Sequence, residues 1–301
     1  MIESLAAYIP MDRCQALARG HTLPDRTRGA ALFADISGFT PLTEALVKEL
    51  GPRRGADELT RQLNRVYDAL ITEVHRYRGS VSTFSGDAIT CWLDGDGGLR
   101  AAACALAMQQ AMGQFSQIKT PSGATVSLAM KAAVTTGPVR RFLIGAPDIQ
   151  LIDVLAGATL DHMAEAEHHA QKKEVVLGPE TVAHLSGAVN VTARRTDPDT
   201  GQTFAVVSRL TNPVEPNPWP ALPANSLTEE EIRPWLLAPV YERLRSGQGQ
   251  FLAELRPAVA LFLRFGGLDY DDDDAAGQKL DAYIRWVQSV LARYESYLFQ
   301  L

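Results

Sequence analysis

Two short motifs in this chain each place an aspartate beside glycine and small residues at the end of an apolar run. Residues 33–40 contain Asp35 and Gly38, and residues 83–88 contain Asp87. Magnesium takes hard oxygen ligands, usually one or two carboxylates together with phosphate oxygens and water. Phosphates prefer the unpaired backbone N–H groups at a helix start. Together the two motifs indicate a site for a nucleoside triphosphate and its metal ions.

Each motif taken alone has a second interpretation. An aspartate next to glycine is common in turns and helix caps, because both residues suit those backbone conformations. Either motif by itself therefore fits a structural turn as well as a metal site. The pair is more specific, since two carboxylates at the ends of neighbouring strands can share the same ions.

The elements that must position the first aspartate are a buried strand and a helix. Residues 30–34 are almost wholly apolar and predict the strand. Thr40 and Pro41 then predict a helix start with Thr40 as its N-cap, and Glu44 is placed to complete the cap. The helix is expected to end at Gly51 and Pro52.

The second aspartate is expected in the tight turn of a hairpin. Apolar residues at helical spacing predict a helix over 57–77, and two β-prone runs around Ser85, Gly86 and Asp87 follow it. Beyond the hairpin, the pattern predicts a helix over 99–115 and strands over 125–135 and 141–144. This order is an α+β pattern, a sheet backed by helices.

These motifs in this order closely resemble the metal-binding half of class III adenylate and guanylate cyclases. More narrowly, they resemble the first cyclase domain of the soluble, bicarbonate-responsive type. The resemblance runs over residues 28–210 and implies a ferredoxin-like sheet. It also implies conversion of ATP to 3′,5′-cyclic AMP and pyrophosphate with two Mg²⁺ or Mn²⁺ ions, as in an adenylate cyclase.

The resemblance assigns a role to each motif residue. Asp35 and Asp87 are the expected catalytic metal ligands, and the carbonyl of Ile36 is implied as a third protein ligand. Two cations held by shared carboxylates can activate the attacking oxygen and neutralise the leaving group. The backbone N–H groups expected to cradle the triphosphate belong to Ser37, Gly38, Phe39, Thr40 and Gly86.

Other positions depart from the family pattern. Asp161 and Ala164 stand where the catalytic half of the family carries an asparagine and an arginine, so a homodimer of this domain is expected to be catalytically poor. Thr83 and Ala164 stand where bicarbonate-responsive members bind the anion, so no activation of that kind is expected. The sequence interpretation of Lys131, Arg140 and Arg141 is that they are surface charges rather than phosphate ligands.

The chain divides by composition into four parts. Residues 1–27 predict a helical lead-in, with helices over 2–7 and 12–19. Residues 28–210 are the part that the resemblance to class III cyclases covers, and it implies a cyclase domain there. Residues 211–256 are a proline-rich linker followed by a helix over 240–255.

Residues 257–301 resemble the start of a second cyclase domain, one strand over 260–268 and one helix. Arg264 takes the place of Asp35 and cannot hold Mg²⁺. The missing half of the active site is therefore expected from a complementary second cyclase domain, either in a C-terminal continuation of the chain or in trans.

Composition excludes several classes of partner. The 301 residues carry a formal charge of −6, which argues against binding to nucleic acid or to acidic membranes. No apolar run approaches the roughly 18 residues of a membrane span, and no signal peptide is evident, so a cytoplasmic protein is expected. The three widely spaced cysteines suggest a reducing compartment.

Two other functions remain open at this stage. The fold could serve as a non-catalytic nucleotide-binding or regulatory module. A diguanylate cyclase would use a similar metal chemistry, but the hairpin lacks the Gly-Gly-acidic-acidic-Phe turn of that family. The choice between ATP and GTP is also open, because the residues that read the base are expected in the second domain.

Overall fold

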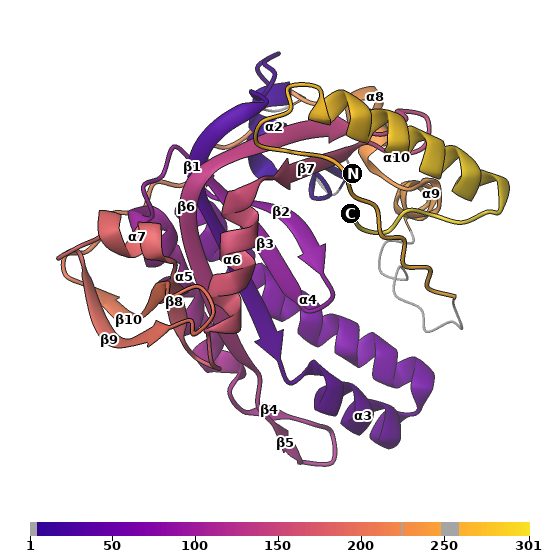
Figure 1. Ribbon diagram of the computed structural model, residues 1–301. Helices are drawn as coiled ribbons and strands as arrows, with labels where there is room; N and C mark the ends of the chain where they lie inside the picture. The colour runs from indigo at the N-terminus through magenta and orange to yellow at the C-terminus, as the bar shows by residue number, and fades with distance from the viewer. Residues whose placement is uncertain (1–4, 224, 248–258) are drawn as a thin grey trace. The chain divides into compact units, whose positions relative to one another are not determined.

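A computed structural model describes residues 5–223, 225–247 and 259–301 (Figure 1). The chain forms two compact units, each built from segments that are separated in the sequence. The larger unit comprises Thr27–Val139 and Ala158–Pro220. The smaller unit comprises Met1–Arg26, Arg140–Gly157 and Ala221–Leu301. Both aspartate motifs lie in the larger unit.

A mixed β-sheet forms the centre of the larger unit, with strand order β2-β3-β1-β6-β8-β10-β9. Strand β1 pairs with β3 in antiparallel orientation, whereas β6 pairs with β8 in parallel. The strands are β1 (Arg26–Ser37), β2 (Ser80–Ser85), β3 (Ala88–Asp94), β6 (Ala129–Ile144), β8 (Val175–Leu177), β9 (Val189–Thr196) and β10 (Thr203–Leu210). Two short strands, β4 (Ile118–Lys119) and β5 (Thr125–Val126), pair with each other.

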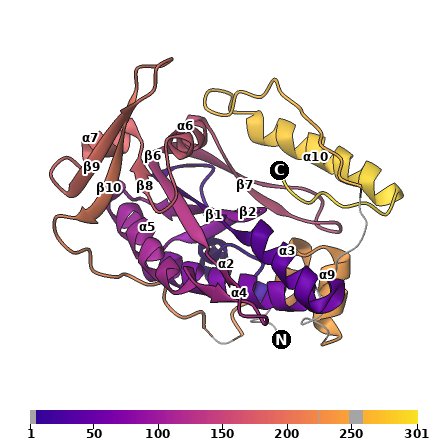
Figure 2. The ribbon, with the colours of Figure 1, turned by 90° about the horizontal axis from the view of Figure 1, so that it is seen from below.

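Helices cover both faces of this sheet (Figure 2). Successive side chains of a strand point to opposite faces. Accordingly Ala132 lies in the apolar cluster beneath α3, α4 and α5, and Ala133 lies in a second cluster with Ala166 of α6. The helices are α3 (Phe39–Leu50), α4 (Pro52–Arg76), α5 (Leu99–Met112), α6 (Ala158–His168) and α7 (Pro179–His184). The expected α+β architecture, a sheet backed by helices, is confirmed.

The start of α3 corrects one expectation. The helix begins at Phe39, its N-cap is Gly38, and no side chain caps it, so Thr40 is not the N-cap and Glu44 completes no cap. Gly38 has a φ of 109°, a left-handed conformation that glycine adopts without strain. This turn leads the chain directly from β1 into the helix and places Thr40 inside its first turn.

Strand β6 corrects a second expectation, because Gly137 and Pro138 do not interrupt it. The hydroxyl of Thr159 donates a hydrogen bond of 2.6 Å to the Pro138 carbonyl. A Cβ at position 137 would lie 2.3 Å from the same hydroxyl oxygen, so only glycine permits this approach. One long strand from Ala129 to Ile144 therefore replaces the break expected between the two predicted strands.

The smaller unit contains two apolar clusters. One gathers α2 (Met11–Leu17), α8 (Glu229–Ile232) and α9 (Ala238–Arg245) around the buried Trp235. The other packs α10 (Ala276–Arg293) against the end of β6 and its antiparallel partner β7 (Ile152–Ala156). A 3₁₀ helix, Arg233–Trp235, follows α8.

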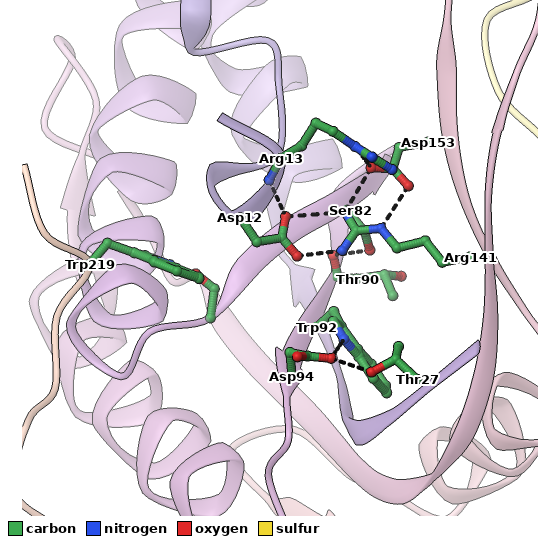
Figure 3. Close-up of polar contacts among 11 residues, drawn as sticks. Asp12, Arg13, Thr27, Ser82, Thr90, Trp92, Asp94, Arg141, Asp153 and Trp219 are labelled. Atoms are coloured by element: carbon green, nitrogen blue, oxygen red, sulfur yellow. Dashed lines mark hydrogen bonds and ion pairs between the residues drawn. The ribbon is translucent and has the colours of Figure 1, made fainter. Parts of the chain in front are cut away.

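A buried ion network lies in the smaller unit (Figure 3). Arg141 donates hydrogen bonds to both Asp12 and Asp153, including one of 2.8 Å from Nε to Asp153 Oδ1, and Arg13 pairs with Asp153 at 3.0 Å. The side chains of all four are at most 8% exposed. Arg140 is also buried and pairs with Asp25 at 2.7 Å. The expectation that Arg140 and Arg141 are surface charges is therefore wrong.

The terminal segments match the sequence predictions in part. The helix predicted over 12–19 appears as α2, the helix of the C-terminal segment appears as α10, and α9 covers the beginning of the helix predicted over 240–255. Residues 1–4 and 248–258 lie outside the described part of the chain, and with them the beginning of the helix predicted over 2–7 and the end of the helix predicted over 240–255. The strand predicted over 260–268 is wrong, because these residues form no regular element. A strand needs a neighbouring strand to satisfy its backbone groups, and an apolar run alone does not supply one.

Candidate active site

The pairing of β1 with β3 brings the two predicted aspartates together. Asp35 lies opposite Ala88 in the ladder, and the Ile36 N–H donates to the Asp87 carbonyl at 3.3 Å. Because Asp87 directly precedes Ala88, both aspartates stand at the same end of the sheet. Asp35 is half-buried and Asp87 is exposed. The structure thus places Asp35, Ile36, Gly86 and Asp87 in one location, as the two motifs predicted.

The hairpin turn is held by a tyrosine of the helix that precedes it. Ser85 pairs with Ala88, which leaves Gly86 and Asp87 as a two-residue turn. Tyr67 of α4 donates its hydroxyl to the Gly86 carbonyl at 3.3 Å. Burial, together with the charges of Asp87 and Asp35, raises the pKa of Tyr67 to about 12. The phenol therefore stays protonated at neutral pH and remains a donor.

Lys131 and Glu167 complete a charged cluster around Asp35. The ammonium of Lys131 lies 3.6 Å from Asp35 Oδ2 and also forms an ion pair with Glu167. The interpretation of Lys131 as a surface charge is wrong, since its side chain is only 26% exposed. The signal in the sequence was a single lysine within the otherwise apolar run of residues 128–134.

Electrostatics at Asp35 reflect this crowding. Burial raises the pKa of the Asp35 carboxyl, Lys131 opposes that effect, and Asp87 and Glu167 raise the pKa again. The net pKa is above its usual value. For Lys131, burial lowers the pKa, but pairing with Glu167 and Asp35 outweighs it and the net pKa is raised. The site holds excess negative charge that one lysine only partly balances.

This donor set fits magnesium or manganese. Among the described residues, no group of three or more His, Cys, Asp or Glu side chains is arranged to hold a metal ion. Zinc and calcium sites usually recruit more protein ligands. Mg²⁺ is commonly bound by one or two carboxylates, with water and substrate phosphates completing its shell. Asp35 and Asp87 match that requirement, and the nearby Glu167 adds to the negative charge at this location.

The start of α3 fits an anion. The first N–H groups of a helix have no partner within the helix, and no side chain caps this one. The side chain of Phe39 is buried in the core, so only its backbone N–H is placed to bind an anion. The Ser37 hydroxyl is already engaged, because it donates to the Ala129 carbonyl at 3.2 Å. The backbone from Ser37 to Thr40 is thus the candidate phosphate cradle.

Replacing Gly38 with alanine should destabilise the larger unit by about 2–4 kcal/mol, because it adds left-handed strain and overpacking. A Cβ at this position would lie 2.5 Å from the Ser127 carbonyl oxygen. Gly86→Ala is the matched control: its φ is also positive, at 64°, but nothing lies within 4 Å of the added carbon. It should cost about 1 kcal/mol. Urea unfolding of both variants measures the difference, and equal losses would contradict it.

The two positions that depart from the family pattern lie on α6. Asp161 and Ala164 are both exposed.

No helix in the described ranges is long and apolar enough to cross a membrane.

The fold of this domain is shared with solved structures of cyclases. The matching solved structures include a guanylyl cyclase and an adenylyl cyclase. The guanylyl cyclase Cya2 matches with a TM-score of 0.54 and 24% identity, covering 63% of this chain and 95% of that one. The adenylyl cyclase CyaB from P. aeruginosa matches with a TM-score of 0.50 and 19% identity, covering 60% and 94%. The chain therefore shares the fold of these two cyclases.

Sequence comparison points to particular relatives. Over 189 residues the chain is 26% identical to adenylate cyclase type 10 of Homo sapiens, and 25% identical to the protein of that name from Rattus norvegicus. The match covers 59% of this chain and 11% of the human relative, so the chain spans only a small part of the curated relatives' length. No family model matches the chain.

Proposed function

We propose that this chain supplies the metal-binding half of a nucleotidyl cyclase that converts ATP into 3′,5′-cyclic AMP and pyrophosphate. The observation that carries the proposal is the placement of Asp35 and Asp87 at one end of the sheet, beside the uncapped start of α3. Carboxylates for metal ions and free N–H groups for phosphates are the two needs of a bound nucleoside triphosphate.

The reaction is an in-line substitution at the α-phosphorus. The ribose 3′-oxygen forms a bond to this phosphorus, the bond to the bridging oxygen of the β-phosphate breaks, and pyrophosphate leaves while the hydroxyl proton passes to water. Two bound Mg²⁺ or Mn²⁺ ions would activate the attacking oxygen and neutralise the leaving group. Asp35, Asp87 and the Ile36 carbonyl would hold these ions. The N–H groups of Ser37 to Thr40 and of Gly86 would orient the phosphates.

The remaining contacts are assigned to a complementary cyclase domain. On α6, the exposed Asp161 and Ala164 stand at the places where the family resemblance implies an asparagine and a charge-stabilising arginine. By the same resemblance, Arg264 of the C-terminal segment takes the place of Asp35 and cannot bind a metal ion. We therefore assign base recognition and transition-state charge stabilisation to a partner domain.

ATP is preferred over GTP in this proposal because the curated relatives are adenylate cyclases. The solved structures of similar fold include both a guanylyl and an adenylyl cyclase and favour neither base. A cytoplasmic location is part of the proposal and agrees with the three cysteines, all of them buried free thiols.

The test is a complementation assay. The chain is mixed with a cyclase domain that carries the base-reading and arginine residues but lacks the metal aspartates, and ATP or GTP is supplied with Mn²⁺ or Mg²⁺. Cyclic AMP detected by mass spectrometry in the mixture, with little from either protein alone, would support the proposal. Metal-dependent ATP binding without product in the mixture would replace it with the regulatory-module function.

A further inference from the structure

The ammonium of Lys131 lies beside Asp35 in the proposed metal site. Lys131 lies on β6 and Asp35 on β1, and the two strands are neighbours in the sheet. The ammonium is 3.6 Å from Asp35 Oδ2 and forms an ion pair with Glu167 of α6. The three side chains are 26%, 28% and 17% exposed, respectively. Charges in such partly buried positions interact more strongly than pairs in open solvent.

We propose that Lys131 is a built-in counter-ion that competes with the divalent metal for Asp35, and that Glu167 is the alternative partner that holds the ammonium when metal binds. This inference rests on the proposed metal role of Asp35. The lysine stem has four flexible carbons, so the ammonium can shift between two carboxylates without moving the strand.

The two carboxylates have opposite effects on the competition. A divalent ion at Asp35 places two positive charges next to the Lys131 ammonium. The repulsion between the two cations weakens metal binding. Glu167 lowers this repulsion by retaining the ammonium on the side of α6. Without Glu167, Lys131 has Asp35 as its remaining partner and opposes the metal more strongly. Metal affinity is thereby linked to the position of α6.

This arrangement predicts substitutions of opposite sign. Lys131→Met should tighten Mn²⁺ binding by about tenfold or more, the range expected for removing one nearby like charge. Glu167→Gln should weaken binding several-fold. In the Lys131→Met background, the Glu167→Gln change should lose most of its effect, because no ammonium remains for Glu167 to hold.

The measurement is titration of the nucleotide-free full chain with Mn²⁺, with free Mn²⁺ followed by electron paramagnetic resonance. Lys172→Met, an exposed lysine just beyond α6, is the control with the same change in charge. Thermal unfolding of each variant confirms that it is folded. The inference is overturned if Lys131→Met binds no tighter than Lys172→Met. It is also overturned if Glu167→Gln weakens binding equally in both backgrounds, since that result means simple charge addition.

The same titration separates this inference from the proposed function. If Asp35→Asn leaves Mn²⁺ binding unchanged, the metal site itself is wrong, and the proposed function fails with it. If Mn²⁺ binding depends on Asp35 but is insensitive to Lys131, only the counter-ion role is lost.

Discussion

Asparagine at position 35 or 87 is expected to reduce cyclic AMP formation in the complemented assay by about a thousandfold or more, the loss of several kcal/mol of metal-based stabilisation. Asparagine keeps the size of aspartate but removes the negative charge that holds the ions. In the proposed mechanism both carboxylates hold the same ions, so the double variant should be little worse than either single variant.

The folding stability of the Asp35→Asn variant should not fall with its activity. Because burial and the charges of Asp87 and Glu167 raise the pKa of Asp35, the folded state disfavours its ionised form. The stability that this group contributes is therefore lost as the pH rises from its unfolded pKa through its raised folded pKa. At neutral pH the neutral Asp35→Asn variant should unfold at the same temperature as the wild type or higher.

The control is Asp68→Asn, which changes an exposed aspartate on α4 and should alter neither activity nor unfolding. Product formation by the chain and its partner is measured with saturating Mn²⁺ and ATP, and thermal unfolding by circular dichroism. Activity of Asp35→Asn within tenfold of the wild type would show that the paired carboxylates are not the metal ligands. A large fall in unfolding temperature would show that Asp35 serves the fold.

The second large effect is structural. Arg141→Met should destabilise the smaller unit by about 3–5 kcal/mol, the usual cost of removing one partner from a buried ion pair. The change leaves the buried carboxylates of Asp12 and Asp153 without their shared guanidinium, although the Arg13 side chain still pairs with Asp153 and its backbone N–H still donates to Asp12. Arg285→Met is the matched control, because this arginine of α10 is 46% exposed and pairs with Asp281. It should cost less than about 1 kcal/mol. Urea unfolding at neutral pH compares them.

The pH dependence of the same variant gives an independent check. Burial alone would raise the pKa of Asp153, but Arg141 and Arg13 lower it, and the net pKa is below its usual value. The unfolded chain therefore binds the proton more readily, so this contribution is complete above the unfolded pKa of about 4. It is lost as the pH falls through the lowered folded pKa. The stability gap between wild type and Arg141→Met should shrink on acidification, and a gap independent of pH would contradict the network's role.

Local chemistry made much of the site predictable. The left-handed Gly38, the two-residue turn at Gly86 and Asp87, and the apolar stripe of α4 depend on residues close in the sequence, where backbone preference and periodicity operate. Those features were enough to predict two aspartates at one end of a helix-backed sheet. The N-cap was missed because a glycine turn begins the helix before the threonine.

The environments of the charged side chains could be decided only by tertiary structure. Arg141 is buried because Asp12, 129 positions away, meets it, and Lys131 reaches the site because β6 lies next to β1. A charged residue gives the same local signal whether it is solvated or paired in the interior, since its partners come from distant segments. The apolar run at 260–268 shows the same dependence, because a strand forms only where another strand offers its backbone. The sequence by itself thus determined the two carboxylates and the turns that present them, while the packing of distant segments decided which cations surround them.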